Sequence, residues 1–374
     1  MRILIAPDKF KGSLTAVEAA AAIAEGALRV YPDAVTTQFP VADGGEGTLE
    51  AAVAAGYEER INAVVGPILA PIGAAWAYRK DGSGATTAVI ETAQASGLAH
   101  MEPTPENSLR AHSYGCGQLI AAALDAGATE IVLGVGGSAM TDGGSGALRA
   151  LGLKPLDAAG NVVPLGGGSL ADAVSLDVTG LDPRLSAVKF RIAVDVQSPL
   201  YGTTGAAHVF GRQKGADDDA IEKLDAGLRN WASLLREATG RDVNVPGAGA
   251  AGGFPASFLA FTQATLEGGF ALVAALTGLA ERLADADLVI TGEGSMDSQS
   301  LTGKAPIALA EAARDLGIPV VAVAGRILVT PEELAEHGVV AAAQLLDVAP
   351  SPQDAMADAG KYLVWATRQV LEGA

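Results

Sequence analysis

The chain has 374 residues, a formal net charge of −18, 49% hydrophobic residues and a single cysteine. The acidic balance argues against a nucleic-acid or anionic-membrane partner, because either would require a basic face. Apolar runs are interrupted by Gly, Asp or Glu well before the roughly 18 residues of a membrane span, and residues 1–8 lack the apolar length of a signal peptide. Since Cys116 cannot form an internal disulfide, we expect a reducing compartment, the cytoplasm.

The first sixty residues alternate between strand and helix signals. Residues 2–6 and 35–41 predict buried strands, and the Ala-rich helical stretch between them begins with the capping-box pair Thr15 and Glu18. A βαβ unit of this kind predicts a parallel sheet with functional loops at the carboxyl ends of its strands. The two loops that follow the strands are Pro7-Asp8-Lys9-Phe10-Lys11-Gly12-Ser13 and Ala42-Asp43-Gly44-Gly45-Glu46-Gly47-Thr48.

The middle of the chain follows a different pattern. Residues 61–65, 74–78 and 86–90 alternate like antiparallel strands, and residues 108–126 have the spacing of one amphipathic helix. Residues 131–135 and 190–196 predict further strands, the second of which contains Asp195. A third glycine-rich loop spans residues 246–253.

A glycine-rich segment, residues 134–146, joins the strand at 131–135 to a helical stretch at 147–151. A strand, a glycine-rich turn and a helix start together direct backbone N–H groups toward an anion, and Thr141 and Asp142 add a hydroxyl and a carboxylate. The structural alternative is a tight turn in which Asp142 caps the helix. The segment also matches G-x-G-x-x-A, but Asp157, in register to bind a ribose, stands in a turn pattern, which disfavours NAD.

The C-terminal ninety residues return to the alternation of strands and helices. Strands are predicted at 287–291, 320–324 and 339–345, and the first runs into a loop from Gly292 to Lys304. This loop is not a P-loop, because Ser298 and Ala305 replace required residues. We therefore predict an α/β fold of two domains, with the active site in the cleft between them. A discontinuous Rossmann-like parallel-sheet domain comprises residues 1–64 and 285–374, and an inserted α/β domain with a mixed sheet comprises residues 65–284.

Charged residues recur beside glycines at the predicted loop tips. The four histidines show no paired metal-ligand spacing, and neither a Ser/His/Asp nor a Cys/His nucleophile pattern is present. Carboxylates, lysines and glycine-rich turns are the groups that phosphoryl transfer with Mg²⁺ employs. The residues concerned are Asp8, Lys9, Lys11, Asp43, Glu46, Asp142, Asp195, Lys214, Glu293, Asp297 and Lys304.

Seven ordered motifs resemble the type-1 glycerate kinase family and together span nearly the whole chain. They are the loops 7–13 and 41–48, Gly136-Gly137-Ser138-Ala139 with Thr141-Asp142-Gly143-Gly144, Asp195-Val196 with Pro199-Leu200, Gln213-Lys214-Gly215-Ala216, residues 246–253, and Gly292-Glu293-Gly294 with Asp297, Gln299 and Gly303-Lys304. The resemblance implies an ATP- and Mg²⁺-dependent kinase that converts D-glycerate to 2-phosphoglycerate, built from two α/β domains.

Four positions depart from the pattern of that family. Met140 stands where Thr is expected, Arg212 where Pro is common, Ser198 where Asn often precedes Pro199, and Ser295 where Arg is frequent. Ser198 and Ser295 adjoin expected site residues, so they bear on substrate specificity. The acids and lysines are unchanged, so the reaction class stands.

The expected roles follow from the chemistry of phosphoryl transfer. Asp195 is the expected base for the glycerate hydroxyl, with Asp297 as the alternative, since the acceptor hydroxyl must lose its proton. Lys9, Lys11 and Lys304 would neutralise the substrate carboxylate or the transferred phosphoryl group. Asp43, Glu46 and Glu293 would contact Mg²⁺ or substrate hydroxyls, with Asp43 and Glu293 as metal ligands. The remaining expected substrate- or phosphate-binding residues are Ser138, Thr141, Asp142, Lys214, Gly249, Gly252 and Gln299.

Two other functions remain open at this point. One is a non-catalytic anion-binding or regulatory protein on the same scaffold, which the presence of the acids disfavours. The other is an NAD-dependent oxidoreductase. The expected partner is a small molecule rather than a nucleic acid or a membrane, and the oligomeric state is undetermined, with a homodimer as one alternative.

Overall fold

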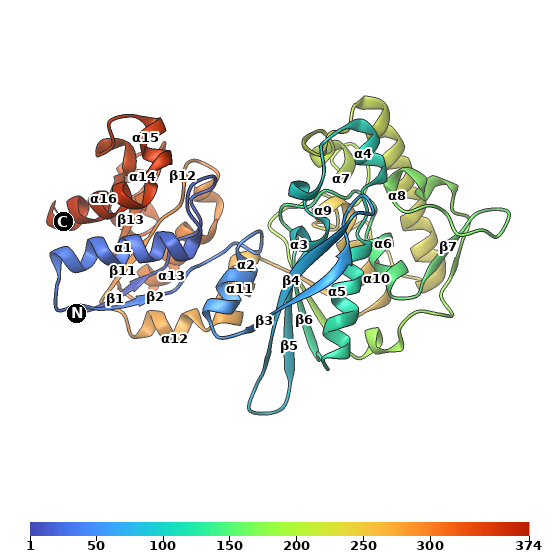
Figure 1. Cartoon of the computed structure of the whole chain (residues 1–374), viewed down its shortest axis with the longest axis horizontal. Helices are drawn as coiled ribbons and strands as arrows, with labels where there is room; N and C mark the ends of the chain where they lie inside the picture. The colour runs from blue at the N-terminus through green and yellow to red at the C-terminus, as the bar shows by residue number, and fades with distance from the viewer. Residues whose placement is uncertain (374) are drawn as a thin grey trace. The chain divides into compact units, whose positions relative to one another are not determined.

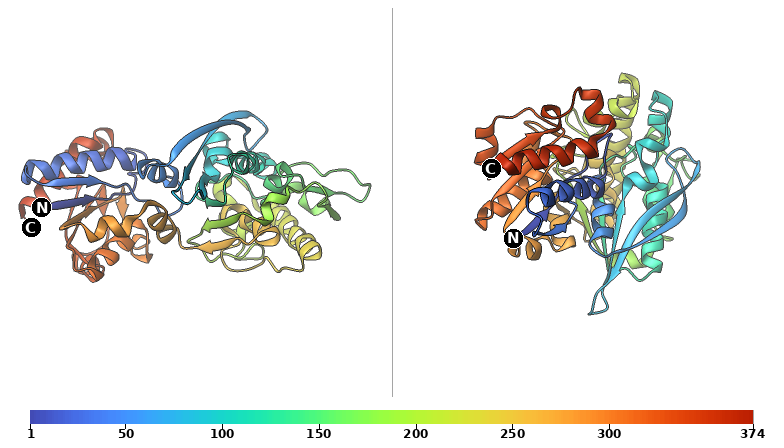
Figure 2. Two further views of the ribbon diagram at one scale, coloured as in Figure 1. Left: turned by 90° about the horizontal axis from the view of Figure 1, so that it is seen from below. Right: turned by 60° about the vertical axis from the view of Figure 1, so that its left-hand side comes forward.

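The computed structural model describes residues 1–373, which form two compact units (Figure 1). Unit 1 comprises Met1–Asp43, Glu50–Ala55 and the chain from Phe270 onward, and unit 2 comprises Gly44–Leu49 and Gly56–Gly269. Both ends of the chain therefore belong to unit 1 (Figure 2). None of the helices in residues 1–373 combines the length and the apolar character that crossing a bilayer requires.

Unit 1 contains a five-stranded, fully parallel sheet in the order β15-β13-β11-β1-β2. From β1 the chain moves outward to β2, whereas β11, β13 and β15 follow one another in the opposite direction. The order of strands thus reverses between β1 and β11. The strands are β1 (Arg2–Ile5), β2 (Val35–Gln38), β11 (Leu288–Thr291), β13 (Val320–Ala324) and β15 (Val339–Gln344).

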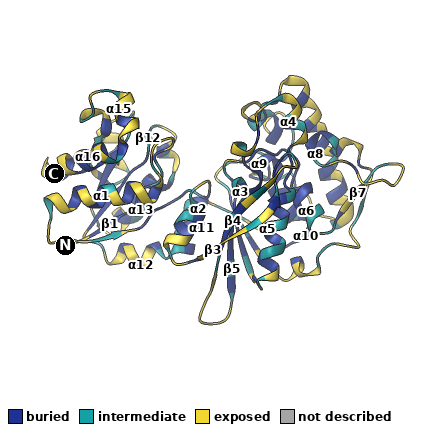
Figure 3. Ribbon diagram, viewed as in Figure 1, coloured by how far each residue is buried: buried dark blue, intermediate teal, exposed yellow. Residues whose placement is uncertain are grey.

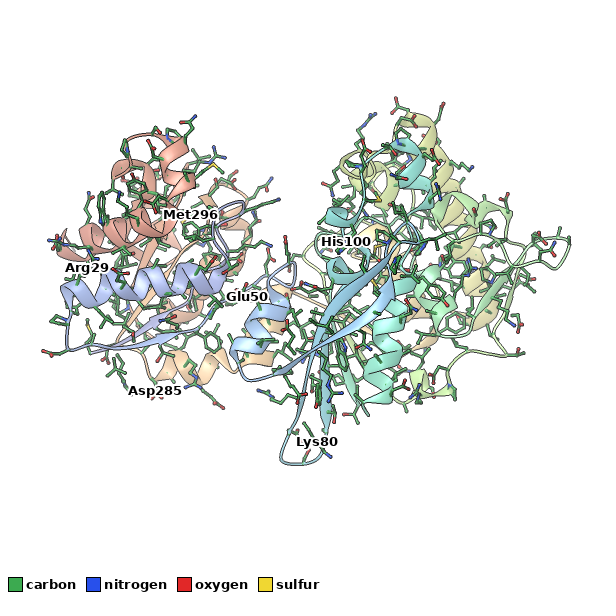
Figure 4. The ribbon with its side chains drawn as sticks, viewed as in Figure 1. Arg29, Glu50, Lys80, His100, Asp285 and Met296 are labelled. Carbon is green, nitrogen blue, oxygen red and sulfur yellow. The ribbon has the colours of Figure 1, made fainter. Side chains whose placement is uncertain are left out.

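Helices cover both faces of this sheet (Figure 3). Successive strand residues point to opposite faces and so pack in different clusters. Ile3 and Ile5 pack with α1 and α16, whereas Leu4 packs with α12 and α13. The capping box of Thr15 and Glu18 at the start of α1 is confirmed. The helices are α1 (Ala16–Val30), α2 (Thr48–Ala54), α11 (Gly269–Thr277), α12 (Leu279–Ala284), α13 (Ala305–Asp315), α14 (Pro331–Glu336), α15 (Pro352–Ala357) and α16 (Ala359–Gly373). Two short strands, β12 (Ser295–Met296) and β14 (Arg326–Ile327), pair in parallel, and Met296 is buried in unit 1 (Figure 4).

Unit 2 contains a six-stranded mixed sheet in the order β10-β9-β6-β5-β4-β3. The pairs β3–β4 and β4–β5 are antiparallel, and the remaining pairs are parallel. The strands are β3 (Glu58–Val65), β4 (Pro71–Lys80), β5 (Thr86–Glu91), β6 (Glu130–Gly134), β9 (Lys189–Ala193) and β10 (Thr265–Glu267), with β7 (Lys154–Leu156) and β8 (Ser175–Asp177) forming a separate hairpin.

Two hydrophobic clusters stabilise unit 2. One contains the sheet, α5 and Phe254 and Phe258, and the other surrounds the apolar face of α8, including the buried Trp231. The helices are α3 (Thr92–Ser96), α4 (Pro105–Arg110), α5 (Tyr114–Asp125), α6 (Ser145–Ala150), α7 (Ala206–Phe210), α8 (Asp218–Thr239), α9 (Ala250–Gly253) and α10 (Pro255–Phe261).

The predicted fold class is confirmed: a discontinuous parallel-sheet unit and a unit with a mixed sheet. The predicted boundaries, at residues 64/65 and 284/285, are not those at which the units divide. Residues 58–65 pair with β4 along the whole of β3 and so belong to unit 2. Residues 270–284 belong to unit 1, because Leu279 and Leu283 are buried in its core.

The single helix predicted over residues 108–126 is wrong. The structure has two helices, α4 and α5, separated at Ala111, His112 and Ser113. His112 donates its backbone N–H to Pro67, and the backbone and hydroxyl of Ser113 both donate to Asp142, 2.8 Å away in each case. These long-range hydrogen bonds draw the three residues out of helical geometry, and the local periodicity contains no sign of them.

A testable consequence of the fold concerns Arg191, which joins three parallel strands of unit 2. Its guanidinium contacts Glu130 on β6 at 3.2 Å and binds Glu267 on β10 through both Nε and Nη2, and the hydrogen bonds from Arg191 lower the pKa of Glu267 to about 2. Arg191→Met leaves two partly buried carboxylates without this partner. We expect a loss of about 1–3 kcal/mol at pH 7 in urea unfolding followed by tryptophan fluorescence.

The pH dependence has a definite sign. A carboxyl group whose pKa is lowered by folding stabilises the folded state above its unfolded pKa of 4.5, and this stabilisation disappears as the pH falls toward 2. The difference between Arg191→Met and wild type should therefore shrink between pH 4.5 and 2. The control is Arg29→Met, at a residue labelled in Figure 4. It breaks the exposed ion pair with Glu25 and should cost only about 0.5 kcal/mol. Equal losses for the two variants at pH 7 would contradict this account.

Candidate active site

A pocket of about 670 Å³ lies in unit 1, at the carboxyl ends of the parallel strands. Loops that follow all five strands of the sheet contribute to its wall. This is the edge at which open α/β sheets bind ligands, and the loops after β1 and β11 flank the point where the strand order reverses. The charged residues in the wall are Asp8, Lys9, Lys11, Asp43, Glu293, Asp297, Lys304 and Arg326.

The loop after β1 is fixed against the loop after β11 by backbone contacts. The N–H of Asp8 donates to the carbonyl of Gly292 at 2.8 Å, and Phe10, fully buried, anchors the turn that carries Lys9 and Lys11. A side chain at Gly292 would place its Cβ 1.9 Å from the carbonyl oxygen of Val323, so only glycine fits there. These contacts bring the β1 acid and the β11 acid, Glu293, into the same wall.

The carboxylates of the pocket are crowded. Burial raises the pKa of Asp8 to about 7, and the charges of Asp43 and Glu293 act in the same direction, against the hydrogen bond that Asp8 accepts from the Lys9 N–H at 2.7 Å. Burial also raises the pKa of Glu293, and its Oε1 is buried without a hydrogen-bond partner among residues 1–373. A bound proton or a bound cation would therefore stabilise these buried carboxyl groups.

The magnesium ion expected from the sequence would need oxygen ligands from the acids of this pocket. Within residues 1–373 no group of three or more His, Cys, Asp or Glu side chains is placed to hold a metal. Magnesium in phosphoryl-transfer sites is usually held by one or two carboxylates together with waters and substrate phosphates. The unpartnered Oε1 of Glu293, and Asp43 in the same pocket, fit that smaller requirement. Their role as metal ligands stays a prediction.

Arg326 is a pocket residue that the sequence analysis missed. Its Nε donates to the hydroxyl of Ser295 at 2.9 Å, and the two residues are register partners in the β12–β14 pair. Its guanidinium makes no ion pair within the described chain, so Nη1 and Nη2 can meet an anion in the pocket. The signal was present, since Gly325-Arg326 directly follows a predicted strand, as the other cation-bearing loops do.

Asp297 and Gln299, both expected in the site, lie in one turn. Asp297 Oδ1 accepts the N–H of Gln299 at 2.8 Å, and Ser300 caps the same turn. Asp297 lines the pocket, whereas Gln299 is exposed and is not part of its wall.

In unit 2, the buried carboxylate of Asp142 has a structural role that the sequence analysis had left as the alternative. It accepts the N–H groups of Gly144 and Gly146 at the start of α6, and both donors of Ser113. These four hydrogen bonds engage both of its oxygens. Binding of a substrate or metal by Asp142 stays a prediction.

Lys214 is buried beneath the same glycine-rich loop. Its Nζ donates to the carbonyl of Met140 at 2.6 Å and lies 3.4 Å from the hydroxyl of Ser138. Burial lowers the pKa of this amine to about 7, which Asp142 only partly opposes. The sequence analysis grouped Ser138 and Lys214 for phosphate binding, and the structure does bring them together.

The glycines of the 246–253 loop are required by backbone packing. A Cβ at Gly252, whose φ is +67°, would lie 2.1 Å from the carbonyl oxygen of Met140, and one at Gly249 would lie 2.2 Å from that of Pro199. The Gly143 N–H donates to the Gly252 carbonyl at 3.0 Å. Three motifs that are far apart in sequence are thus packed backbone to backbone, with Thr141 buried among them.

Two further predicted residues also belong to unit 2. Asp195 is exposed just beyond β9, and its Oδ1 accepts the N–H of Gly269 at 2.7 Å. Glu46 is exposed in a loop whose following N–H groups, those of Gly47 and Leu49, donate to the buried Glu91. Asp43, three residues before Glu46, belongs to unit 1.

Comparison with known proteins identifies the class of this protein. The family model described as the glycerate kinase family matches residues 3–373. The chain is 43% identical over 372 residues to glycerate 2-kinase of Escherichia coli (strain K12), and 44% identical over 373 residues to glycerate kinase of Bacillus subtilis (strain 168). Each alignment covers 99% of this chain and 97% of the relative. A crystal structure presented as a candidate glycerate kinase 2 from Salmonella typhimurium LT2 matches with a TM-score of 0.85 and 41% identity, covering 99% of this chain and 96% of the other.

The chain with this α/β fold is thus an enzyme, a kinase. More particularly, the chain belongs to the glycerate kinase family, as the seven motifs predicted. This finding replaces the two alternatives. The geometry also argues against the oxidoreductase alternative. Asp157 lies in an exposed turn, where it accepts the N–H groups of Ala159 and Asn161, and not at the end of a strand, where a ribose-binding acid would lie.

Proposed function

We propose that the enzyme transfers the γ-phosphoryl group of ATP to the 2-hydroxyl of D-glycerate, giving 2-phosphoglycerate and ADP. Membership of the glycerate kinase family supports the substrate, since relatives at 43–44% identity bear the names glycerate 2-kinase and glycerate kinase. The observation that carries the proposal is the unit 1 pocket, where three lysines, one arginine and four carboxylates share one wall.

The cations and the carboxylates of the pocket have different proposed roles. The cations Lys9, Lys11, Lys304 and Arg326 hold the glycerate carboxylate and the phosphoryl oxygens, which carry negative charge throughout the transfer. Asp43 and Glu293 hold Mg²⁺, which supplies charge neutralisation at the phosphate oxygens. The glycine-rich loops of unit 2, with Ser138 and Lys214, hold the nucleotide phosphates.

Three carboxylates are candidates for the proton acceptor at the glycerate hydroxyl. Asp195 remains our proposed base and Asp297 the alternative, and Asp8 joins them because of its place in the pocket and its raised pKa. If Asp195 fills this role, Asp8 and Asp297 serve mainly to balance the lysines and to position the substrate.

The proposed reaction is tested by turnover of ATP with D-glycerate and Mg²⁺, with the products resolved by ³¹P NMR. We expect ADP and 2-phosphoglycerate. A 3-phosphoglycerate product would overturn the position of transfer, and ADP only with another hydroxy acid would overturn the substrate. Failure to form ADP with any hydroxy acid would contradict the whole proposal.

The choice of base is tested by three matched Asp→Asn variants, which keep side-chain size and remove the charge. Asp195→Asn should lower kcat by about 10²–10⁴-fold while the affinity for ATP is retained, because a general base contributes by that factor. Asp8→Asn and Asp297→Asn should lower kcat less and raise the KM for D-glycerate more. If either of these has the larger effect on kcat, the role passes from Asp195 to that residue.

The role of Arg326 is tested by moving its guanidinium across the β12–β14 pair. Arg326→Ser should lower kcat/KM for D-glycerate about tenfold or more, as expected for a lost charge-assisted hydrogen bond. Ser295 is the register partner, so the double variant S295R/R326S returns an arginine to the same place and should recover most of this loss. The proposal for Arg326 fails if Arg326→Ser retains wild-type kcat/KM, or if the double variant is no better than Arg326→Ser.

The cellular setting remains part of the proposal. The only cysteine, Cys116, is buried, and burial raises the pKa of its thiol to about 12, which is the state of an inert thiol in a reducing compartment such as the cytoplasm. The charge of −18 supports a small-molecule partner over a nucleic acid. A homodimer is the oligomeric state to be tested, by light scattering of the purified chain.

A further inference from the structure

A second cavity, of about 580 Å³, lies within unit 2 between α4, the turn at residues 67–69, α6 and α8. None of its residues lines the unit 1 pocket or was expected in the active site. Its volume falls in the range of small-molecule sites. The ionisable side chains in its wall are Glu106, Arg110, His112, Arg149 and Lys223.

The wall of this cavity carries net positive charge, whereas the protein as a whole is strongly negative. Three cations face one carboxylate, Glu106, which is already paired with Arg110 at 3.0 Å on the surface of α4. Neither Arg149 nor Lys223 forms an ion pair among residues 1–373. In a chain of net charge −18, two unpaired cations in one cavity indicate a place for an anion.

His112 supplies an independent observation. The residue is 1% exposed, and Nδ1 of its ring accepts the backbone N–H of Tyr114 at 3.3 Å. The neutral ring must then carry its proton on Nε2. Burial and Arg149 lower the pKa of this imidazole, against the charge of Asp142, so the neutral form is favoured. The Nε2–H is therefore a buried donor, and it has no hydrogen-bond partner within the described chain. A buried donor left unpaired destabilises the folded protein, and an acceptor in the cavity would recover that free energy.

Arg149 offers the complementary charge. It lies on α6 and is half-buried, and its Nη1 donates to the carbonyl of Val163 at 3.0 Å. That bond fixes the guanidinium while leaving donors of the planar group for a second partner, the geometry that suits a carboxylate or phosphate. The neighbouring acid, Asp142, does not compete, since its oxygens accept four hydrogen bonds from Ser113 and the start of α6.

We propose that this cavity is a second binding site, for a small molecule that carries a carboxylate or a phosphate, held by the guanidinium of Arg149 and the Nε2–H of His112. Lys223 and Arg110 lie in the same wall and add positive charge. The proposal does not depend on the substrate or on the product of the kinase reaction. Because α6 follows the glycine-rich loop 136–144 directly, an anion bound here stabilises the helix to which that loop leads.

The test is hydrogen–deuterium exchange of the full chain with inorganic phosphate or malonate, each against sodium chloride at equal ionic strength. At least one of the two anions should slow exchange in residues 105–114 and 145–150. Which of them does so separates a phosphate site from a carboxylate site. Absence of protection with both anions would overturn the proposal.

Variants separate this site from the unit 1 pocket, which also attracts anions. Arg149→Met and His112→Phe keep the bulk of the side chain and should each weaken the protection about tenfold or more in anion concentration, as expected for the loss of a hydrogen bond to a charged group. Arg149→Lys keeps the positive charge but lacks the planar, forked donors of the guanidinium. It shows whether a loss of protection in Arg149→Met comes from misfolding. Lys304→Met, in unit 1, should leave the protection unchanged. Equal protection in wild type, Arg149→Met and His112→Phe would overturn the proposal.

Discussion

Charge balance in the unit 1 pocket is the constraint on which the account of this enzyme depends. Burial, together with the nearby charges of Asp43 and Glu293, raises the pKa of Asp8, and Glu293 retains an unpartnered oxygen among the described residues. Lysines and an arginine in the same wall offset the negative charge of these acids. The parallel sheet produces the crowding, since the loops after all of its strands end at one edge and the strand order reverses between β1 and β11.

Unit 2 achieves its local order by a different physical means. Its glycine-rich loops are packed so closely that a Cβ at Gly249 or Gly252 would collide with a carbonyl group of another loop. Lys214 and Asp142 form hydrogen bonds with backbone groups of the loop at residues 140–146. Glycine is required at these positions by protein backbone, whether or not a phosphate also approaches. A rigid loop with aligned N–H groups is nevertheless what an anion site needs, so the structural and functional interpretations of these glycines are compatible.

The sequence predicted those features that depend on local pattern. The strands of the parallel sheet, the capping box at Thr15 and the discontinuous arrangement followed from periodicity and turn residues. It did not predict the break between α4 and α5, because the cause is Asp142, some thirty residues later in the chain. The predicted domain boundary near residue 64 differs from the observed one for a similar reason. The pairing of β3 with β4, which places residues 58–65 in unit 2, is a tertiary contact that local sequence patterns do not reveal. Of the predicted lysines and acids, those that follow the strands of the parallel sheet line the unit 1 pocket, and their catalytic roles stay predictions. Arg326, which also lines the pocket, was not predicted, and Gln299, predicted from its motif, is exposed outside the pocket wall.

The central claim is that the carboxylates of the unit 1 pocket bind the metal that accompanies the phosphoryl group. The most direct measurement is a crystal structure of the enzyme with D-glycerate, a non-hydrolysable ATP analogue and Mn²⁺ in place of Mg²⁺, with the metal located by its anomalous scattering. The account predicts an anomalous peak within coordination distance of Glu293 or Asp43, beside the terminal phosphate. A metal bound to the nucleotide with no carboxylate of that pocket as a ligand would contradict it.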